Sequence, residues 1–452
     1  MMSRATGHYI SASVCALWLA EFALAFVLVC AMAVSGGAAA VPESWRIPVS
    51  LNTANHAALL AVTLGATAGA IGLYRPDVCL APRRAAQHAA VVALLAFPIA
   101  LIIGSTLQTG RVGAYAIWLA KVLAVWVVGL LITRWALHVP LTRALTPRRL
   151  ASVGATGSGR LMMALRSRRG GMFEVAQVIE PGGRTPQPQD LRAARIWAVV
   201  APDATELADP AWLIDLRMRG IRVLHEAGFC EQMLGRVSLD LLGPSWFLEP
   251  AGFDSGAASL ALKRACDIVV SLVLLVISLP VMGLAALAVR IDSPGPILYR
   301  QERVGLGGRV FTLLKFRSMR ADAEEGGRPV WAAQADPRVT RVGAFIRSTR
   351  IDELPQLFNV LRGDMSLVGP RPERPMFVNE LARVIPFYNQ RNYLKPGITG
   401  WAQVNYPYGA SVEDAREKLS YDLYYLRYRS LLFDLFILAA TVRVILFREG
   451  AR

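Results

Sequence analysis

Two adjacent carboxylates, Asp352 and Glu353, are the side chains of this sequence best suited to chemistry. In such a pair, one carboxylate can attack phosphorus while the other holds Mg²⁺, which prefers oxygen ligands. An acidic residue at a helix start is also a common cap, so the pair alone does not establish a site. The residues around it must decide between capping and catalysis.

Basic residues flank the pair on both sides. Arg347 and Arg350 precede it, and the turn Gly369-Pro-Arg-Pro372 presents Arg371 after it. Further basic side chains lie upstream in two short runs: Arg300, Arg303, Lys315, Arg317 and Arg320. Guanidinium forks match phosphate oxygens, so this pattern indicates a metal–phosphate centre. A basic face toward anionic lipid explains some of these residues, but not why they surround two carboxylates.

A capped helix is predicted to position the pair. Apolar residues recur at i, i+3, i+4 and i+7 in the run 349–363, namely Leu354, Leu357, Phe358 and Leu361. We expect Asp352 at the N-cap, Pro355 in the first turn and Gly363 at the C-terminal stop. Both carboxylates would then lie where the helix dipole favours anions.

The composition predicts a membrane protein. The 452 residues have a mean hydropathy of +0.39 and a formal charge of +16. Four apolar stretches, at about 10–35, 55–74, 88–107 and 114–137, each approach the ~20 residues that cross a bilayer. Basic residues in the flanking segments place both ends of this unit, residues 1–144, on the cytoplasmic side. No zinc-finger spacing or basic-aromatic RNA module is present, so nucleic acid is not an expected partner.

Two charged residues fall inside these apolar stretches. Glu21 and Lys121 are predicted either to form a functional intramembrane pair or to make only a packing or snorkelling contact.

Residues 145–250 have the character of a soluble α/β domain. Strands are predicted at 175–179, 196–200 and 221–224, with a helix at 210–219. The glycine stretch Gly154-Ala-Thr-Gly-Ser-Gly159 suggests nucleotide binding, but its spacing differs from GxGxxG. A Rossmann-like domain with a regulatory or structural role is the competing interpretation.

The apolar run 262–291 is long enough to span a bilayer. A fifth crossing, however, would place the basic remainder, 292–452, outside the cell. Pro280 lies mid-run and favours a kink. We therefore predict a re-entrant membrane helix that breaks at Pro280, with a plain spanning helix as the alternative. The remainder is predicted to be a cytoplasmic domain whose apolar helix, 431–447, lies on the membrane face.

Residues 263–447 resemble the bacterial sugar transferase family, the monotopic phosphoglycosyl transferases. The resemblance rests on five runs: Lys263-Arg-Ala-Cys-Asp267, Ser293-Pro-Gly-Pro-Ile297, Lys315-Phe-Arg-Ser-Met319, the segment from Arg347 to Pro372, and Lys395-Pro-Gly-Ile-Thr-Gly-Trp-Ala-Gln-Val-Asn405. The apolar front and the α/β middle look like the long-form polyprenyl-phosphate hexose-1-phosphate transferases of exopolysaccharide biosynthesis. The expected fold is thus a four-helix transmembrane unit, a Rossmann-like middle domain and an α-rich catalytic domain with a re-entrant helix.

The resemblance also implies a reaction and roles. It implies transfer of a sugar-1-phosphate from a UDP-sugar to undecaprenyl phosphate at the cytoplasmic face of the bacterial inner membrane. Asp352 matches the nucleophile that forms a phospho-aspartate, and Glu353 matches the Mg²⁺ ligand. Pro280 matches the helix-breaking proline, although Leu279 separates it from Ser278. Substrate-phosphate positions are matched by Lys315, Arg347, Arg371 and Arg303, and a later acidic position by Asp422.

Other interpretations follow from the same sequence. A catalytically inactive membrane scaffold or regulator of polysaccharide export is one, although the intact Asp352-Glu353 pair argues against decay. A transporter is disfavoured because few spans and no internal repeat are visible. The sugar is not disclosed; UDP-glucose or UDP-galactose is expected from the family, and a homodimer is expected from long-form relatives.

Overall fold

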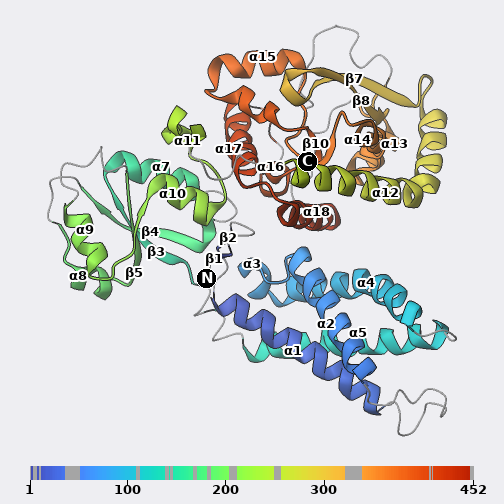
Figure 1. Cartoon of the computed structure of the whole chain (residues 1–452), viewed down its shortest axis with the longest axis horizontal. Helices are drawn as coiled ribbons and strands as arrows, with labels where there is room; N and C mark the ends of the chain where they lie inside the picture. Colours follow the sequence, from blue (N-terminus) through green and yellow to red (C-terminus); the bar gives the residue numbers. More distant parts are fainter. Residues whose placement is uncertain are drawn as a thin grey trace. The chain divides into compact units, whose positions relative to one another are not determined.

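The computed structural model describes residues 2–3, 8–9, 12–35, 51–107, 112–137, 142, 146–165, 170–180, 185–202, 211–248, 256–320, 338–406, 409 and 411–447. Chain contacts divide the protein into two units (Figure 1). One unit comprises Met1–Ser3 and Tyr9–Pro147, and the other comprises Arg4–His8 and Arg148–Arg452. Two short strands, β1 (Met2–Ser3) and β2 (His8–Tyr9), lie at the start of the chain.

Apolar helices build the first unit. These are α1 (Ala12–Ser35), α2 (Leu51–Ile71), α4 (Pro82–Leu107) and α5 (Val112–Ala136), with the short α3 (Pro76–Cys79) between α2 and α4. Each long helix overlaps one predicted apolar stretch. Among the described residues, Pro82–Ile102 and Tyr115–Ala136 are long and apolar enough to cross a membrane, as is Ala257–Asp292 in the second unit. The chain is therefore a membrane protein.

Glu21 pairs with a residue other than Lys121, so of the two alternatives the Glu21–Lys121 pair is not formed. Glu21 Oε1 lies 2.7 Å from Nε of Arg134, and both side chains are buried. Lys121 instead lies on an exposed face of α5. Arg134 also donates to Sγ of Cys79 at 2.7 Å, so the pair ties α1, α3 and α5 together. The apolar stretches show that Glu21 and Lys121 lie inside helices. They do not show which cation lies beside Glu21 once the helices pack.

A four-stranded parallel sheet opens the second unit, in the order β4-β3-β5-β6. Along the chain, β3 (Arg148–Val153), α7 (Ala155–Leu165), β4 (Phe173–Ile179), α8 (Pro188–Ala193), β5 (Ile196–Ala201), α9 (Ala211–Met218) and β6 (Val223–His225) alternate. The three predicted strands and the predicted helix coincide with β4, β5, β6 and α9. Gly154, at φ +83°, forms the turn between β3 and α7.

The segment after β6 packs against the C-terminal region. It contains α10 (Glu226–Phe229), a π-helical turn (Cys230–Leu234) and α11 (Pro244–Leu248). Its Arg236 lies 2.5 Å from Glu417, and Trp401 Nε1 donates to the carbonyl of Gly235 at 2.8 Å. Val237 and Trp246 belong to the C-terminal core.

Helices dominate the C-terminal region, which also holds an antiparallel hairpin of β7 (Leu298–Val304) and β8 (Val310–Phe316). A small parallel pair, β9 (Ser366–Val368) and β10 (Gly397–Thr399), lies beside it. The helices are α13 (Arg341–Ser348), α14 (Gln356–Arg362), α15 (Pro375–Val384), α16 (Trp401–Asn405), α17 (Val412–Tyr428) and α18 (Leu431–Leu446). Trp401, Tyr421, Tyr424 and Phe433 are among its most buried side chains.

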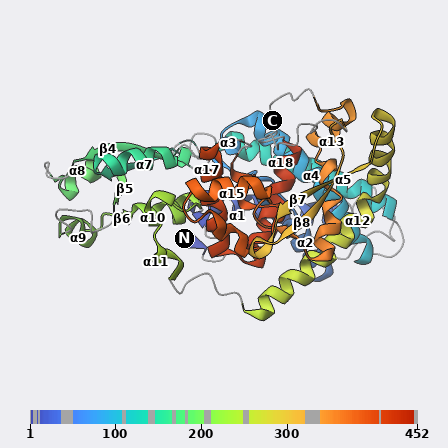
Figure 2. The same cartoon turned by 90° about the horizontal axis from the view of Figure 1, so that it is seen from above.

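Helix α12 (Ala257–Asp292) contains Pro280 and turns sharply near its middle in both views (Figures 1 and 2). Its first half is anchored by Arg264, which donates to the carbonyls of Val360 and Leu361 at 2.6 and 2.8 Å. Met282 and Val289, in its second half, share a buried cluster with Phe316 and Ile346. Both halves therefore contact the same C-terminal region.

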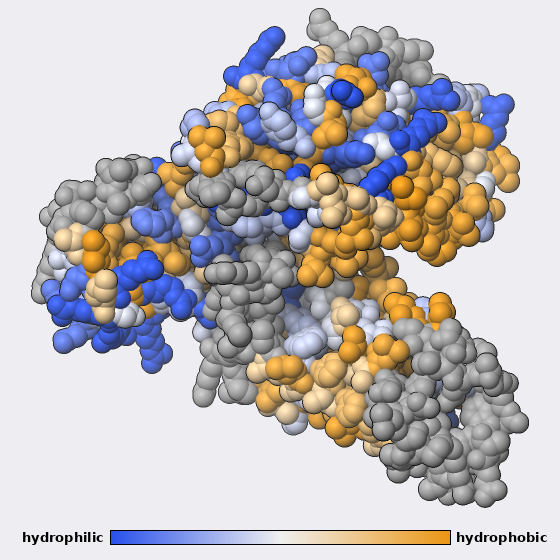
Figure 3. All heavy atoms as spheres, in the orientation of Figure 1, coloured by the Kyte–Doolittle hydropathy of each residue, from blue (hydrophilic) through white to orange (hydrophobic). Residues whose placement is uncertain are grey.

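The outward side of α12 is apolar (Figure 3). Exposed large side chains follow it on both sides of the bend: Val269, Leu272, Val273, Val276, Ile277, Leu279, Leu284 and Leu287. Helix α18 also exposes Leu432, Leu435 and Leu446 while burying Phe433, Ile437 and Ala440. Contiguous exposed apolar surface of this kind is typical of contact with lipid.

Candidate active site

The carboxylate pair lies in a short 3₁₀ turn, Ile351–Glu353, between α13 and α14. Arg350 initiates this turn with φ +60°, and Pro355 then precedes α14. The predicted N-cap role of Asp352 is therefore wrong, because the α-helix begins only at Gln356. Pro355 has no N–H for an intrahelical bond, so the helix is restarted after it. Gly363, at φ +96°, ends α14 as predicted.

The apolar face predicted for α14 is only partly correct. Leu357 and Val360 are buried, but Phe358 is 40% exposed and Asn359 is completely buried. The Asn359 side chain bonds to strand β8: Oδ1 accepts from the amide of Leu314 at 3.0 Å, and Nδ2 donates to the carbonyl of Thr312 at 2.8 Å. Asn359 thus joins α14 to the strand that carries Lys315.

Glu353 is held by two arginines. Its Oε1 lies 3.1 Å from Nη2 of Arg371 and 3.5 Å from Nη1 of Arg350. Burial raises the pKa of Glu353, but Arg371, Lys315 and Arg350 outweigh burial and bring the pKa well below its usual value. Glu353 is therefore a permanently charged carboxylate at neutral pH.

Asp352 has a different environment, although its side chain is only 8% exposed. Its Oδ1 is buried and has no hydrogen-bond partner within the described part of the chain. Burial and the neighbouring charge of Glu353 raise the pKa of Asp352 to about 6, against opposing effects of Lys315, Arg350 and Arg371. An unsolvated, unpartnered carboxylate oxygen is costly in a fold and is typical of a functional site.

Lys315 comes from β8 and lies close enough to the pair to interact with both acids. Burial, Arg371 and Arg303 lower its pKa, Glu353 and Asp352 oppose them, and the net pKa is about 8. Lys315 and Arg371, both predicted from sequence, are thus brought together with Asp352 and Glu353. Two arginines lie close before the pair. Arg350, in the turn after α13, contacts Glu353. Arg347 is half-buried in the last turn of α13.

The turn Gly369–Pro372, which presents Arg371, is fixed by its backbone. The carbonyl of Pro370 accepts from the amide of Gly397, that of Arg371 from Nη2 of Arg391, and that of Pro372 from Nη1 of Arg303, each at 2.9 Å. A Cβ on Gly397 would lie 2.1 Å from the amide nitrogen of Gly369. This close approach explains why glycines stand at both positions.

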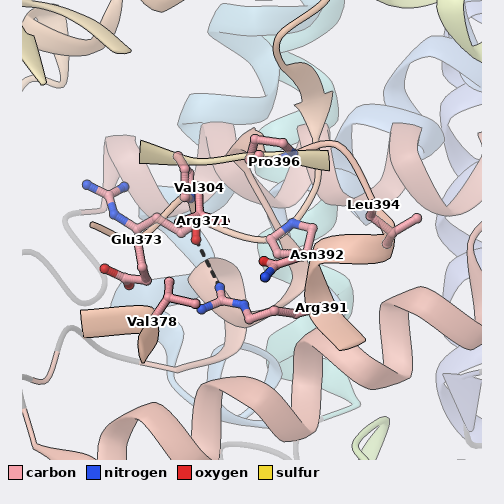
Figure 4. Close-up of a pocket in the computed structure, with 11 residues that line it drawn as sticks. Val304, Arg371, Glu373, Val378, Arg391, Asn392, Leu394 and Pro396 are labelled. Atoms are coloured by element: carbon pink, nitrogen blue, oxygen red, sulfur yellow. Dashed lines mark hydrogen bonds between the residues drawn. The ribbon is translucent and has the colours of Figure 1, made fainter. Parts of the chain in front are cut away.

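Two further predicted residues lie around this turn. Arg303 holds the Pro372 carbonyl and lies 3.6 Å from Glu373, and burial lowers its pKa to about 10. Asp422, on α17, is 2% exposed and lies 2.7 Å from Nη2 of Arg391. Asp422 therefore contacts the turn through Arg391, and its predicted role as a substrate-binding residue stays a prediction. Figure 4 shows the small pocket beside the turn, where Arg391 reaches the carbonyl of Arg371.

Residues 258–448 match the family described as bacterial sugar transferase. The chain is 42% identical over 268 residues to the UDP-N-acetylgalactosamine-undecaprenyl-phosphate N-acetylgalactosaminephosphotransferase of Aeromonas hydrophila, covering 58% of this chain and 62% of that protein. It is 44% identical over 215 residues to the UDP-glucose:undecaprenyl-phosphate glucose-1-phosphate transferase of Caulobacter vibrioides, covering 46% and 80%. It is 41% identical over 191 residues to the exopolysaccharide production protein PSS of Rhizobium leguminosarum, covering 40% and 94%.

The chain belongs to the bacterial sugar transferase family. Membership places it among transferase enzymes. The Rhizobium relative is matched over 94% of its length by 40% of this chain. The chain matches less than two thirds of the length of the Aeromonas relative.

Among the described residues, the sugar transferase site contains a carboxylate pair but no larger acidic cluster. Within the same residues, no group of three or more His, Cys, Asp or Glu side chains could hold a metal ion. Mg²⁺ in phosphoryl-transfer sites uses one or two carboxylates, with phosphate oxygens and water completing its shell. The buried, unpartnered Oδ1 of Asp352 beside Glu353 fits that donor set.

Three residues that hold or contact the candidate site are not singled out by the sequence. Asn359 lies within a quoted motif but has no predicted role, and Arg391 stands outside every motif quoted above. Arg350 precedes the pair, but the resemblance points to Arg347. Only a resolved turn could show that φ +60° at Arg350 directs its side chain to Glu353.

Proposed function

We propose that the protein transfers a sugar-1-phosphate from a UDP-sugar to undecaprenyl phosphate, with Asp352 as nucleophile. The observation that carries this proposal is the buried, unpartnered Oδ1 of Asp352. A carboxylate with a raised pKa that remains ionised at neutral pH is a stronger nucleophile than an ordinary one. The names of the relatives supply the donor and acceptor classes.

The reaction has two displacements at one phosphorus. A carboxylate oxygen of Asp352 forms a bond to the phosphorus that carries the sugar, and the bond from that phosphorus to the oxygen of the nucleoside monophosphate breaks. An oxygen of polyprenyl phosphate then attacks the same phosphorus, and the bond to Asp352 breaks. The products are UMP and polyprenyl diphospho-sugar, and Asp352 is regenerated as a carboxylate.

The cationic side chains make approach of the reactants favourable. Asp352 and both substrates are anionic, so repulsion would oppose the attack in their absence. Lys315, Arg371 and Arg350 surround the pair and can stabilise charge that develops on the phosphate oxygens. Because they are fixed by the β8 strand, the Gly369–Pro372 turn and the 3₁₀ turn, little reorganisation is needed at reaction.

Mg²⁺ is the cofactor we propose for this site, with Glu353 as its principal protein ligand. When bound, it would neutralise phosphate charge and polarise the reacting phosphorus. Glu353 supports this role because its pKa is far below neutrality, so the carboxylate is always available as a ligand.

The membrane arrangement completes the proposal. A straight 36-residue helix would be about 54 Å long, so its two ends could not both contact one compact region. The bend near the middle of α12, a helix that contains Pro280, and the anchoring of both halves support a re-entrant helix, which keeps the site at the cytoplasmic surface of the inner membrane. We also propose that α1, α2, α4 and α5 form a four-span unit and that the parallel sheet is a Rossmann-like domain.

Topology is tested by single cysteines on the two flanks of α12, at Ser259 and Ile291, in an otherwise cysteine-free chain. Labelling of both from the cytoplasmic side only is expected. Reaction of either one from the periplasmic side alone would support a spanning helix instead.

The activity is tested with membranes containing the full chain, Mg²⁺ and undecaprenyl phosphate. A panel of UDP-glucose, UDP-galactose and UDP-N-acetylgalactosamine is chosen because the relatives' names divide between glucose and N-acetylgalactosamine. Release of UMP with one donor, and transfer of label to lipid, is the expected result. Absence of UMP release with a wider nucleotide-sugar panel would favour the inactive scaffold. Lipid product would support a place at the first membrane step of exopolysaccharide assembly; the name of the Rhizobium relative refers to exopolysaccharide production.

A further inference from the structure

Arg391 is a buried cation that the mechanism above does not use. It lies in the 3₁₀ segment Tyr388–Tyr393 and is 6% exposed. Its Nη2 lies 2.7 Å from Oδ2 of Asp422 and donates to the carbonyl of Arg371 at 2.9 Å. Its Nη1 donates to the hydroxyl of Tyr388 at 2.8 Å. One guanidinium therefore connects α17 to the backbone of the Gly369–Pro372 turn. Figure 4 shows its bond to the carbonyl of Arg371.

The bonded carbonyl belongs to the residue whose side chain reaches the site. Arg371 accepts from Arg391 through its main chain, and its guanidinium lies 3.1 Å from Glu353. The neighbouring carbonyls of Pro370 and Pro372 are held by Gly397 and Arg303. Every carbonyl from 370 to 372 is thus restrained, and the middle one depends on Arg391.

Asp422, on α17, is the acidic partner of Arg391. Asp422 is 2% exposed, and the contact that links it to the turn runs through Arg391. Burial lowers the pKa of Arg391, but Tyr388, Asp422 and Glu373 raise it more, so the guanidinium remains charged. A buried charge pair that bridges two elements fixes their geometry, and removing one partner leaves the other uncompensated.

We propose that Arg391, held by Asp422, is a positioning residue that sets the Gly369–Pro372 turn so that Arg371 meets Glu353 and the donor phosphate. This inference rests on the proposed function. It assigns Arg391 a role in the reaction and changes Asp422 from a substrate-binding residue to a support of Arg391. Lysine cannot replace Arg391, because a single ammonium lacks the planar fork that reaches Asp422, Tyr388 and the Arg371 carbonyl together.

The test compares Arg391→Lys, Asp422→Asn and Arg371→Lys in the full-length protein, with Arg383→Lys as the matched control. Arg383 is an exposed arginine in the last turn of α15. In the UMP-release assay, Arg391→Lys is expected to lower kcat about tenfold or more with a smaller change in donor KM, because misplacement acts on the transition state. Arg383→Lys should match the wild type.

A double variant separates positioning from a general loss of packing. If Arg391 acts through Arg371, adding Arg391→Lys to Arg371→Lys should lower kcat less than about twofold further. Losses that multiply in folded double variants, or a wild-type kcat for Arg391→Lys, would overturn the proposal.

A second readout does not need activity. Hydrogen–deuterium exchange of the peptide covering 366–373 should be faster in Arg391→Lys than in the wild type or Arg383→Lys. If the wild type releases no nucleotide, the proposed function fails. The exchange result then decides the positioning role alone, and unchanged exchange would reject it.

Discussion

Glu353 and Arg371 lie 3.1 Å apart, and this ion pair makes two neighbouring acids chemically unlike. Burial raises the pKa of both acids, but Arg371, with Lys315 and Arg350, brings that of Glu353 below its usual value, whereas the charge of Glu353 adds to burial in raising that of Asp352. The two roles proposed for these acids stay predictions, and this electrostatic difference is the observation that supports them.

Replacing Asp352 by Asn should abolish transfer and stabilise the fold. The folded pKa of about 6 exceeds the usual 3.8, so the folded state binds more protons between these values and loses stability as pH rises through that window. The substituted amide carries no charge, so the variant should be more stable at pH 7, by about 3 kcal/mol at most. Thermal unfolding in nanodiscs, repeated from pH 7 to pH 4, should show this difference shrinking toward zero.

Glu380→Gln serves as the control for that measurement, because Glu380 is exposed on α15. It should change stability by less than about 0.5 kcal/mol. Full turnover of Asp352→Asn would discard the nucleophile assignment, whereas an unchanged stability would discard only the electrostatic argument.

The rate of the first half-reaction should depend on pH through two groups. Below about pH 6, protonation of Asp352 removes the nucleophile, and above about pH 8 Lys315 loses its charge. A bell-shaped profile of kcat/KM is therefore expected. UMP release should be measured without undecaprenyl phosphate, as a burst, so that ionisation of the acceptor does not contribute.

Lys315→Arg provides the discriminating variant for this profile. A guanidinium stays charged throughout the range, so the alkaline limb should move upward while the acidic limb remains. An alkaline limb that does not move in an active Lys315→Arg protein would show that another group controls it.

Much of this site follows from local sequence, and the rest depends on tertiary packing. The adjacent acids, Lys315, Arg371 and the glycine turns are recognisable because their chemistry is carried by short motifs. The sequence leaves open whether Glu21 pairs with Lys121, because two charges inside apolar helices reveal neither their depth nor the face that packing buries. Arg134 is the partner of Glu21 because the last turn of α5 lies beside α3, where Sγ of Cys79 also accepts a hydrogen bond from Arg134.

The prediction of where α14 begins was wrong for a different reason. Apolar periodicity continues smoothly through 354–361, so it cannot show that Pro355 separates a 3₁₀ turn from an α-helix. Arg350 at φ +60° is equally invisible, because this conformation is unusual for a residue other than glycine. The backbone around a functional pair is thus where sequence rules were least informative.

Replacing Glu353 by Gln should raise the Mg²⁺ concentration needed for half-maximal activity by about tenfold or abolish activity, because a neutral amide is a poorer ligand than a carboxylate. The variant also deprives Arg371 of its charged partner. Arg350→Lys is the matched comparison, since it perturbs the same ion-pair network without removing a ligand. A Glu353→Gln enzyme with the wild-type Mg²⁺ titration would contradict the metal role.

Asn359 should contribute to stability and, through β8, to the position of Lys315. Replacing it by Leu removes two buried hydrogen bonds and leaves the Leu314 amide and the Thr312 carbonyl without their partner. The expected cost is about 2–4 kcal/mol in the free energy of unfolding. Asn379→Leu, at an exposed position of α15, is the control and should stay within about 0.5 kcal/mol. Because Asn359 fixes β8 against α14, the variant should also displace Lys315 from the carboxylate pair. Its residual activity should therefore fall further than the loss of folded protein explains, and activity that merely follows the folded fraction would limit Asn359 to a structural role.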